Sequence, residues 1–176
     1  LLVFVLGLCI GSFLNVCIYR IPEKKSIAFP PSHCPSCKHH LNALDLLPLL
    51  GYLFNRGKCR YCKTKISIQY PLVELMTGIF FLLVFNKYLI SIEFLKYIVL
   101  TSLLIAVSFI DIEKQEIPDG LIIFGLIAAL LFNLYHIRTE IISGILGLLL
   151  GGGSFLLIAI LTKGAMGGGD IKLVGA

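Results

Sequence analysis

Long apolar blocks dominate this sequence and limit its possible folds more than any other feature. A helix needs about 20 mostly apolar residues to cross the hydrocarbon core of a bilayer, and lipid cannot satisfy open backbone amides. Hydrophobic residues make up 57% of the chain, more than a soluble domain carries. We therefore predict an all-α polytopic membrane protein. Its spans are expected at Leu1 to Tyr19, Leu72 to Tyr88, Ile92 to Ile110, Leu121 to Tyr135 and Ile141 to Thr162.

Both ends of the sequence indicate a longer native chain. No methionine stands at the start, and Ile171 to Ala176 has the composition of a further span at its beginning. The first apolar block lacks the basic region and the small-residue cleavage site of a signal peptide and runs directly into Arg20. We therefore expect Leu1 to Tyr19 to be retained as a first transmembrane helix.

One polar block, residues 20–70, interrupts the apolar pattern. It holds nine of the fifteen Lys and Arg residues, against only Glu23 and Asp45 as acids. Basic loops stay on the cytoplasmic side of a membrane, so this block is expected there. The sequence thus predicts three parts: a first transmembrane helix at 1–19, a small cytoplasmic domain at 20–70 and a transmembrane bundle at 71–176.

Counting spans from that cytoplasmic block places two acids at the same membrane edge. The chain leaves and returns once before Asp111, and leaves and returns again before Asp170. Charged groups at a membrane are usually tolerated where they face a polar cavity, pair with another group or do chemistry. The two counts therefore predict that Asp111 and Asp170 can share one site.

Simpler interpretations of these acids remain open. Gly167, Gly168 and Gly169 precede Asp170, and they could form a flexible connector with Asp170 as a helix N-cap. The same glycines would let a substrate backbone approach closely. Three other acids compete with Asp111. Asp119 follows Pro118 and suits a turn or cap, and Glu113 and Glu116 fit a solvated loop, whereas Asp111 alone directly follows an apolar span.

Two carboxylates held close together can hydrolyse a peptide bond. Like charges at short range do not both ionise easily, so the pair shares a proton and titrates as a unit. One carboxylate then acts as a base towards water, and the other acts as an acid towards the substrate carbonyl. This chemistry makes Asp111 and Asp170 the predicted catalytic pair.

Two Cys-x-x-Cys turns predict a structural zinc site in the polar block. Twenty-one residues separate them, and four thiolates complete a closed tetrahedral shell. Disulfides and a redox motif are the alternatives, but thiols stay reduced in the cytoplasm. We expect His33, His39 and His40 to lie in solvent, and Cys9 and Cys17 to be small buried residues of the first span. The predicted ligands are Cys34, Cys37, Cys59 and Cys62.

Glu74 and the basic excess allow further hypotheses. Glu74 lies at the start of the second predicted span, where it either favours a helix N-terminus or meets a basic substrate segment. The Lys and Arg residues attract anionic lipid, at about 1 kcal/mol each. Cysteines and prolines interrupt them and no nucleic-acid reading motif is present, so membrane lipid rather than nucleic acid is the expected partner.

A series of motifs resembles the bacterial type IV prepilin peptidases, membrane aspartic peptidases of the Gly-x-Gly-Asp class, over nearly the whole chain. They are Gly11-Ser12-Phe13-Leu14-Asn15-Val16, Tyr19-Arg20-Ile21-Pro22, the two cysteine turns, Tyr70-Pro71-Leu72-Val73-Glu74-Leu75, Asp111-Ile112-Glu113 to Asp119, and Met166-Gly167-Gly168-Gly169-Asp170-Ile171-Lys172-Leu173. The resemblance implies that Asp111 and Asp170 are catalytic. It also makes Glu74 a candidate for substrate or methyl-transfer contacts, and Gly11, Asn15 and Arg20 packing or site-shaping positions. From their lack of side chains, Gly167, Gly168 and Gly169 are expected to shape the site for a substrate backbone.

The resemblance also implies a biological role. Such enzymes lie in the bacterial inner membrane with the active site facing the cytoplasm. They remove the basic leader of prepilins and pseudopilins, and many then methylate the new N-terminal residue with S-adenosylmethionine. Relatives that keep the four cysteines tend to be bifunctional. A non-enzymatic membrane scaffold with a zinc-knuckle partner-binding domain, a transporter using the acids as a relay, and a methyltransferase without proteolysis are the rival hypotheses.

Overall fold

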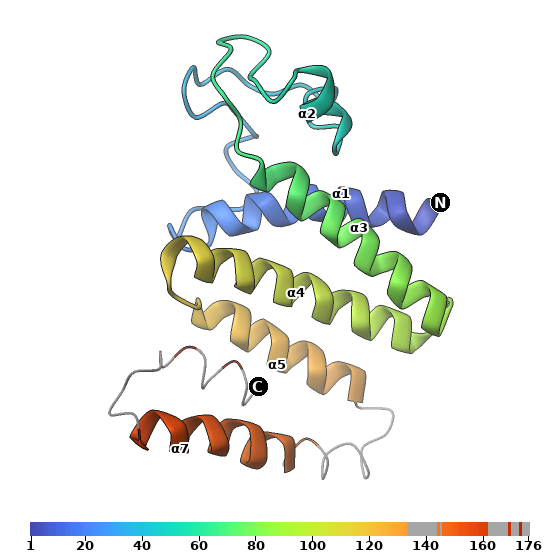
Figure 1. Cartoon of the computed structure of the whole chain (residues 1–176), viewed down its shortest axis with the longest axis vertical. Coiled ribbons are helices and arrows are strands. Elements are labelled where there is room, and N and C mark those ends of the chain that lie inside the picture. The colour runs from blue at the N-terminus through green and yellow to red at the C-terminus, as the bar shows by residue number, and fades with distance from the viewer. Residues whose placement is uncertain (134–143, 145, 162–168, 170–172, 174–176) are drawn as a thin grey trace. The chain divides into compact units, whose positions relative to one another are not determined.

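The computed structural model is mostly helical. It describes residues 1–133, 144, 146–161, 169 and 173. Within these residues, β pairing is confined to two isolated bridges in the polar block. The predicted all-α fold, with a small cysteine-bearing segment inserted after the first helix, is confirmed (Figure 1). The helices are α1 Leu2–Arg20, α2 Leu50–Phe54, α3 Gln69–Tyr88, α4 Ile92–Lys114, α5 Asp119–Asn133, the π-helix η2 Leu148–Gly152 and α7 Gly153–Leu161.

Three of these helices are long and apolar enough to cross a membrane, namely α1, α3 and α4. Large apolar side chains stay exposed along them, such as Phe13 on α1 and Leu83 on α3. In water such surfaces would be costly, whereas lipid tails accept them. The chain is therefore a membrane protein. The shorter apolar helices α5 and α7 fall in the last two predicted spans, and part of the span predicted at 141–162 lies outside the described residues.

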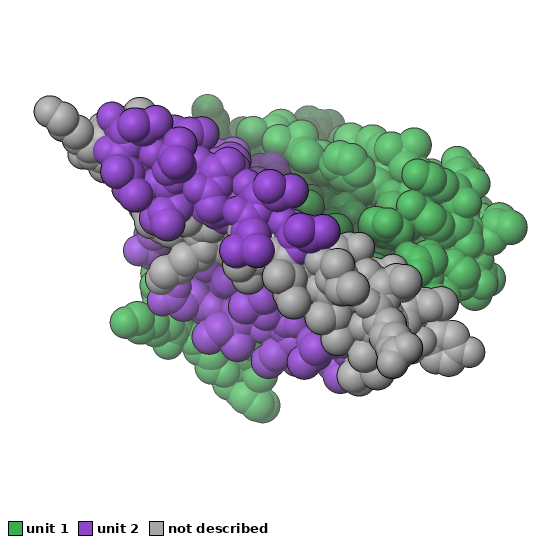
Figure 2. Space-filling view, turned by 90° about the horizontal axis from the view of Figure 1, so that it is seen from below, with its two compact units in different colours: residues 1–106 green, residues 107–176 purple. Residues whose placement is uncertain are grey.

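The chain forms two compact units, residues 1–106 and residues 107–176, and the boundary falls inside α4. Figure 2 colours the two units separately. The first unit contains α1, the polar segment, α3 and the first part of α4. The second unit contains the end of α4, with Asp111, and the helices that follow. The predicted divisions after residues 19 and 70 remain predictions.

Helices α1 and α3 pack at backbone distance because glycines face the contact. A Cβ added at Gly11 would lie 2.6 Å from the Cα of Glu74, and one added at Gly7 would lie 2.7 Å from the Cα of Gly78. Such small residues let helices approach closely in a membrane, where no hydrophobic force drives them together. Thr77 is fully buried at this contact and donates its hydroxyl to the Val73 carbonyl at 2.7 Å. The helix pair thus depends on positions that tolerate no larger side chain.

Polar side chains fix the chain where it leaves α1. Asn15 donates its side-chain amide to the Tyr70 carbonyl at 3.0 Å and thereby joins α1 to the start of α3. Arg20 is buried, and its guanidinium donates to the carbonyls of Ser26 at 2.9 Å and Pro30 at 2.7 Å. A buried charge needs such partners. Arg20 therefore shapes the first turn of the polar segment.

Aromatic pairs join the end of α3 to the start of α4. The rings of Tyr88 and Tyr97 stack with centroids 4.6 Å apart, and those of Phe85 and Phe94 meet edge to face at 5.9 Å. Such pairs add about 0.5–1.5 kcal/mol each beyond area burial. They hold the hairpin between two helices that the sequence predicted as separate spans.

The expectation for the two cysteines of the first span holds for only one of them. Cys17 is buried, as predicted, but Cys9 is exposed. The prediction assumed that a small apolar residue would be covered by protein. In this chain the outward face of α1 is apolar as well, so the sequence pattern does not show which side packs.

Candidate functional site

The two cysteine turns are copies of one backbone motif. The Cys34 amide donates to the His39 carbonyl at 3.0 Å, and the Cys59 amide donates to the Thr64 carbonyl at 2.8 Å. Lys38 and Lys63, each one residue past the second cysteine of its turn, have left-handed φ angles of 60° and 61°. Every partner in the second turn stands 25 residues after its counterpart. The chain therefore presents both pairs of thiols with the same geometry.

The repetition extends beyond the cysteines. Isolated bridges pair His33 with His40 in the first turn and Lys58 with Lys65 in the second. Outside the bridges, the Leu41 amide donates to the Ser32 carbonyl at 2.9 Å, and the Ile66 amide donates to the Gly57 carbonyl at 2.8 Å. From the sequence only the two Cys-x-x-Cys turns were predicted, not the longer repeat around them. The lysine that follows each Cys-x-x-Cys was the available signal for the larger repeat.

The structure brings the four predicted ligands together. All four sulfur atoms, from Cys34, Cys37, Cys59 and Cys62, lie within 4.8 Å of one another. The Sγ atoms of Cys34 and Cys62 are 3.8 Å apart. A tetrahedral site with metal–sulfur bonds of about 2.3 Å has sulfur–sulfur edges of about 3.8 Å. The cluster could therefore hold a metal ion, and its all-sulfur composition and size fit zinc.

Hydrogen bonds prepare some of these thiols for ionisation. The Thr64 hydroxyl, 3.3 Å from Cys62 Sγ, and the Thr64 backbone amide lower the pKa of Cys62 to about 6. The Cys37 amide, with that of Ser36, lowers the pKa of Cys34. At Cys37 the His39 amide lowers the pKa, but desolvation and the neighbouring thiols outweigh it and raise the pKa to about 11. Once the first thiols are ionised, their negative charge makes ionisation of the remaining thiols less favourable. A bound cation would remove this penalty.

The three histidines near the first turn do not join the cluster. His39 and His40 are exposed, as expected, and His33 is half-buried. The His39 ring lies 3.6 Å from that of Tyr61, centroid to centroid, and one His33 ring nitrogen is 3.0 Å from the Pro31 carbonyl oxygen. His33 and His39 therefore contact neighbouring residues of the turns, and the ligand set among the described residues consists of cysteines.

Glu74 connects the membrane helices to the polar segment. Its side chain is buried near the start of α3, and its carboxylate accepts a hydrogen bond from the Leu49 amide at 2.8 Å. Leu49 precedes α2 and has a φ of 58°, a strained conformation for a leucine. The backbone amide of this strained residue is therefore hydrogen-bonded to an acidic side chain of α3. The predicted role of Glu74 in substrate contact stays a prediction, and its contact with Leu49 is a positioning function that the sequence did not indicate.

Asp111 lies in the last turn of α4. Its side chain is exposed, and its backbone carbonyl accepts from the Gln115 amide at 2.8 Å. The helix continues through Glu113, where a solvated loop was predicted, because Glu and Lys are good helix formers. Asp119 begins α5, in keeping with its predicted cap or turn.

The residue preceding Asp170 lies against the segment that follows Asp111. A Cβ added at Gly169 would be 3.1 Å from the Ile117 Cβ, six residues after Asp111. Gly169 is half-buried in this contact. Asp170, Gly167 and Gly168 lie outside the described residues. The second unit therefore joins two segments that the span count had placed at one membrane edge.

Family models match the two parts of the chain in succession. The model described as the bacterial peptidase A24 N-terminal domain matches residues 5–88. The model described as the type IV leader peptidase family matches residues 98–176. The chain belongs to the type IV leader peptidase family. The predicted resemblance is confirmed. Most of α1, the cysteine turns and the region of Asp111 and Asp170 fall within matched domains of this peptidase family.

Curated relatives match nearly all of the chain. A prepilin leader peptidase/N-methyltransferase of Neisseria gonorrhoeae is 39% identical over 98% of this chain and 70% of its own length. Proteins of the same name from Myxococcus xanthus and Bacillus subtilis are 37% and 38% identical. They are matched over 97% and 98% of this chain, and over 52% and 69% of their own lengths. No solved structure gives a significant match.

Proposed function

We propose that this leader peptidase family member is a membrane-embedded aspartic endopeptidase that removes the basic leader of type IV prepilins and pseudopilins. The relatives named above carry prepilin leader peptidase in their names. The main structural support is the contact between Gly169 and Ile117, which favours a short distance between Asp111 and Asp170. Cleavage takes place at the cytoplasmic face of the bacterial inner membrane, where the basic segment lies.

The two carboxylates work as one acid–base unit. In this mechanism one of them is ionised and the other carries the proton. The ionised carboxylate accepts a proton from the attacking water, and the protonated one donates to the scissile carbonyl oxygen. Each role is worth about 10² to 10⁴ in rate. The glycines at 167–169 add no side chains beside Asp170, so the substrate backbone can lie close to it.

The cysteine turns form the structural part of the enzyme. Cys34, Cys37, Cys59 and Cys62 bind zinc, which supplies folding energy to a segment with few large buried side chains. Residues 1–19, 20–70 and 71–176 are the first helix, the cytoplasmic zinc domain and the catalytic bundle. The relatives also carry N-methyltransferase in their names, so the same protein methylates the new N-terminus with S-adenosylmethionine as donor.

Substitution of each acid tests the peptidase assignment. The full-length protein in membrane vesicles receives a synthetic prepilin, and the product masses are read. Asp111→Asn and Asp170→Asn each lower leader removal by about 10² or more, because each removes one proton-transfer group. Asp119→Asn is the matched control: this acid lies nearby in the same unit, at the start of α5, and cleavage should persist.

A non-enzymatic membrane scaffold, the alternative function, makes the opposite prediction. It tolerates both Asp111→Asn and Asp170→Asn, because no step depends on a proton transfer. Full leader removal by either variant, with unchanged expression and metal content, would refute the aspartic mechanism.

A further inference from the structure

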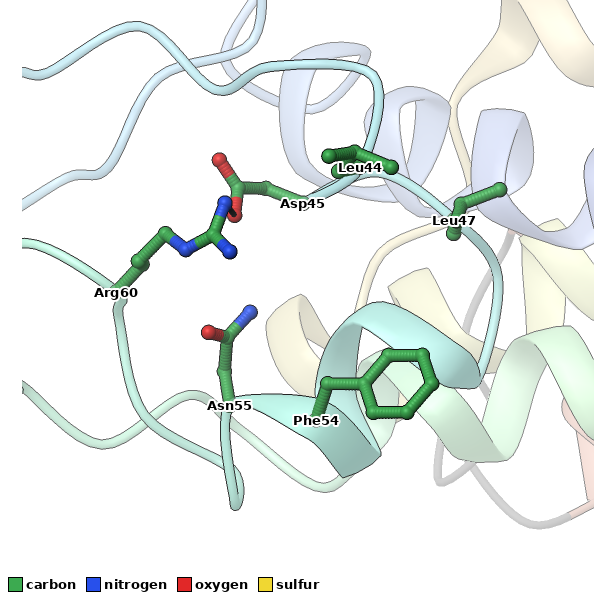
Figure 3. Close-up of a pocket in the computed structure, with 6 residues that line it drawn as sticks. All are labelled: Leu44, Asp45, Leu47, Phe54, Asn55 and Arg60. Atoms are coloured by element: carbon green, nitrogen blue, oxygen red, sulfur yellow. Dashed lines mark ion pairs between the residues drawn. The ribbon is translucent and has the colours of Figure 1, made fainter.

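A cavity of about 140 Å³ opens beside the second cysteine turn. Figure 3 shows its lining, with the Asp45 carboxylate facing the Arg60 guanidinium and the Phe54 ring on the α2 side. An engineered cavity of about 150 Å³ holds one benzene molecule, so a compact group of that size fits here. The lining residues are Leu44, Asp45, Leu47, Phe54, Asn55 and Arg60.

Asp45 is the unusual member of this lining. Its side chain is only 5% exposed. Its Oδ2 accepts from the Asn42 amide at 3.2 Å and lies 3.5 Å from the Tyr61 hydroxyl. Its Oδ1 is the one buried side-chain oxygen or nitrogen without a hydrogen bond among the described residues. A buried carboxylate oxygen left without a donor is costly, so it calls for a ligand with N–H groups.

Arg60 does not satisfy that oxygen. Its Nη1 is 3.7 Å from Asp45 Oδ1, beyond hydrogen-bonding distance, and its side chain is 52% exposed. Because the arginine end of this pair is exposed and its distance is long, moving the Arg60 guanidinium into solvent costs little. A ligand cation can therefore take the position next to Oδ1 while the arginine stays in solvent.

The remaining walls indicate the rest of the ligand. Leu44, Leu47 and Phe54 offer apolar surface, and Phe54 is 77% exposed. An aromatic face attracts a nearby cation. An anionic ligand would meet the buried negative charge of Asp45, so the lining selects for a positive group attached to an apolar body.

We propose that the Asp45 cavity binds an α-ammonium group that carries an apolar side chain, with Asp45 Oδ1 accepting from the ammonium. This inference rests on the proposed function, in which an α-ammonium group occurs twice: at the N-terminus of the processed substrate and in the methionine part of the methyl donor, whose side chain ends in a sulfonium. Both sources share the ammonium from which Asp45 Oδ1 accepts. Asp45 is then a binding residue for the methyl-transfer step.

Direct binding to the purified full-length protein tests the proposal, with L-phenylalaninamide as probe and titration calorimetry as the measurement. The probe binds, and N-acetyl-phenylalaninamide, which lacks the ammonium, does not. Asp45→Asn keeps an oxygen for the Asn42 amide but presents an amide to the cavity, and it weakens binding at least tenfold. Arg60→Gln removes a competing cation and leaves binding equal or tighter. Glu23→Gln, the matched acid-to-amide control in the same segment, changes nothing.

Two further arms separate the possible sources. S-Adenosylhomocysteine that competes with the probe in an Asp45-dependent way assigns the cavity to the donor, and simultaneous binding of both assigns it to the substrate N-terminus. Absence of probe binding, equal binding of the acetylated probe, or undiminished binding by folded Asp45→Asn overturns the proposal. The comparison with N-acetyl-phenylalaninamide uses only the unaltered protein, so it does not depend on the folding of a variant. Leader removal by that protein, measured separately, tests the proposed function and can fail independently of binding.

Discussion

The cysteine segment and the α1–α3 helix pair are stabilised by opposite means. The segment repeats one hydrogen-bonded turn and gathers four sulfurs within 4.8 Å, and most of its large apolar side chains, such as Phe54, stay exposed. The helix pair contains fully buried side chains such as Val73 and Thr77, and its contact is set by glycines. A small segment without a sufficient core needs a metal. Helices in lipid instead need a close fit.

The two regions also meet through polar groups, and this limits their independence. Arg20, at the end of α1, donates to carbonyls at the start of the segment, and Glu74, on α3, accepts from the Leu49 amide before α2. Damage to the segment should therefore leave the helices folded, whereas damage to the helix pair should also disturb the segment.

Loss of the metal is expected to have the largest effect. Structural zinc in small domains contributes about 10–16 kcal/mol of apparent binding energy. Chelation, or Cys59→Ser, should unfold the segment while α1 and α3 stay helical. Limited proteolysis of residues 20–70 together with far-ultraviolet circular dichroism measures both. The control is Cys9→Ser, since Cys9 lies on α1 outside the cluster. Loss of helix signal on chelation would contradict the asymmetry.

A methyl group at the glycine contact should have an intermediate effect. Gly11→Ala places a Cβ 2.6 Å from the Glu74 backbone, so the helices must separate at a cost of about 1–3 kcal/mol. Thermal unfolding in detergent measures the loss, and proteolysis of the segment should rise with it. Gly120→Ala is the matched control, because nothing lies within 4 Å of its added Cβ. Equal melting temperatures for the two variants would show that the close approach is unimportant.

Changes at Glu74 should have the smallest effect and should sharpen the link between the regions. Glu74→Gln keeps an oxygen for the Leu49 amide, whereas Glu74→Ala removes it and costs about 1.5 kcal/mol. Amide exchange around residues 49–54 should therefore accelerate only in the alanine variant. If the glutamine variant loses leader removal with normal exchange, the charge of Glu74 serves the substrate as well.

Much of the fold could be predicted from local pattern. The length of the apolar blocks predicted the spans that appear as α1, α3 and α4, and the cysteine spacing predicted the cluster of four ligands. Helix α4 continues beyond the span predicted at 92–110, because hydropathy marks where a segment leaves lipid and not where helical hydrogen bonding stops. The exposure of Cys9 was missed for a related reason: both faces of a membrane helix are apolar, so periodicity does not identify the packed side.

For the candidate sites, too, the sequence and the tertiary structure determined different things. The sequence by itself determined the residue types and their order: two acids after apolar spans, four cysteines in two turns, and glycines spaced along α1. Only the tertiary structure decided that Gly11 meets the Glu74 backbone, that Glu74 reaches the Leu49 amide, and that Asp45 is left with a buried free oxygen. Local pattern follows from backbone geometry and solvent preference, whereas these contacts depend on the packing of segments far apart in the chain.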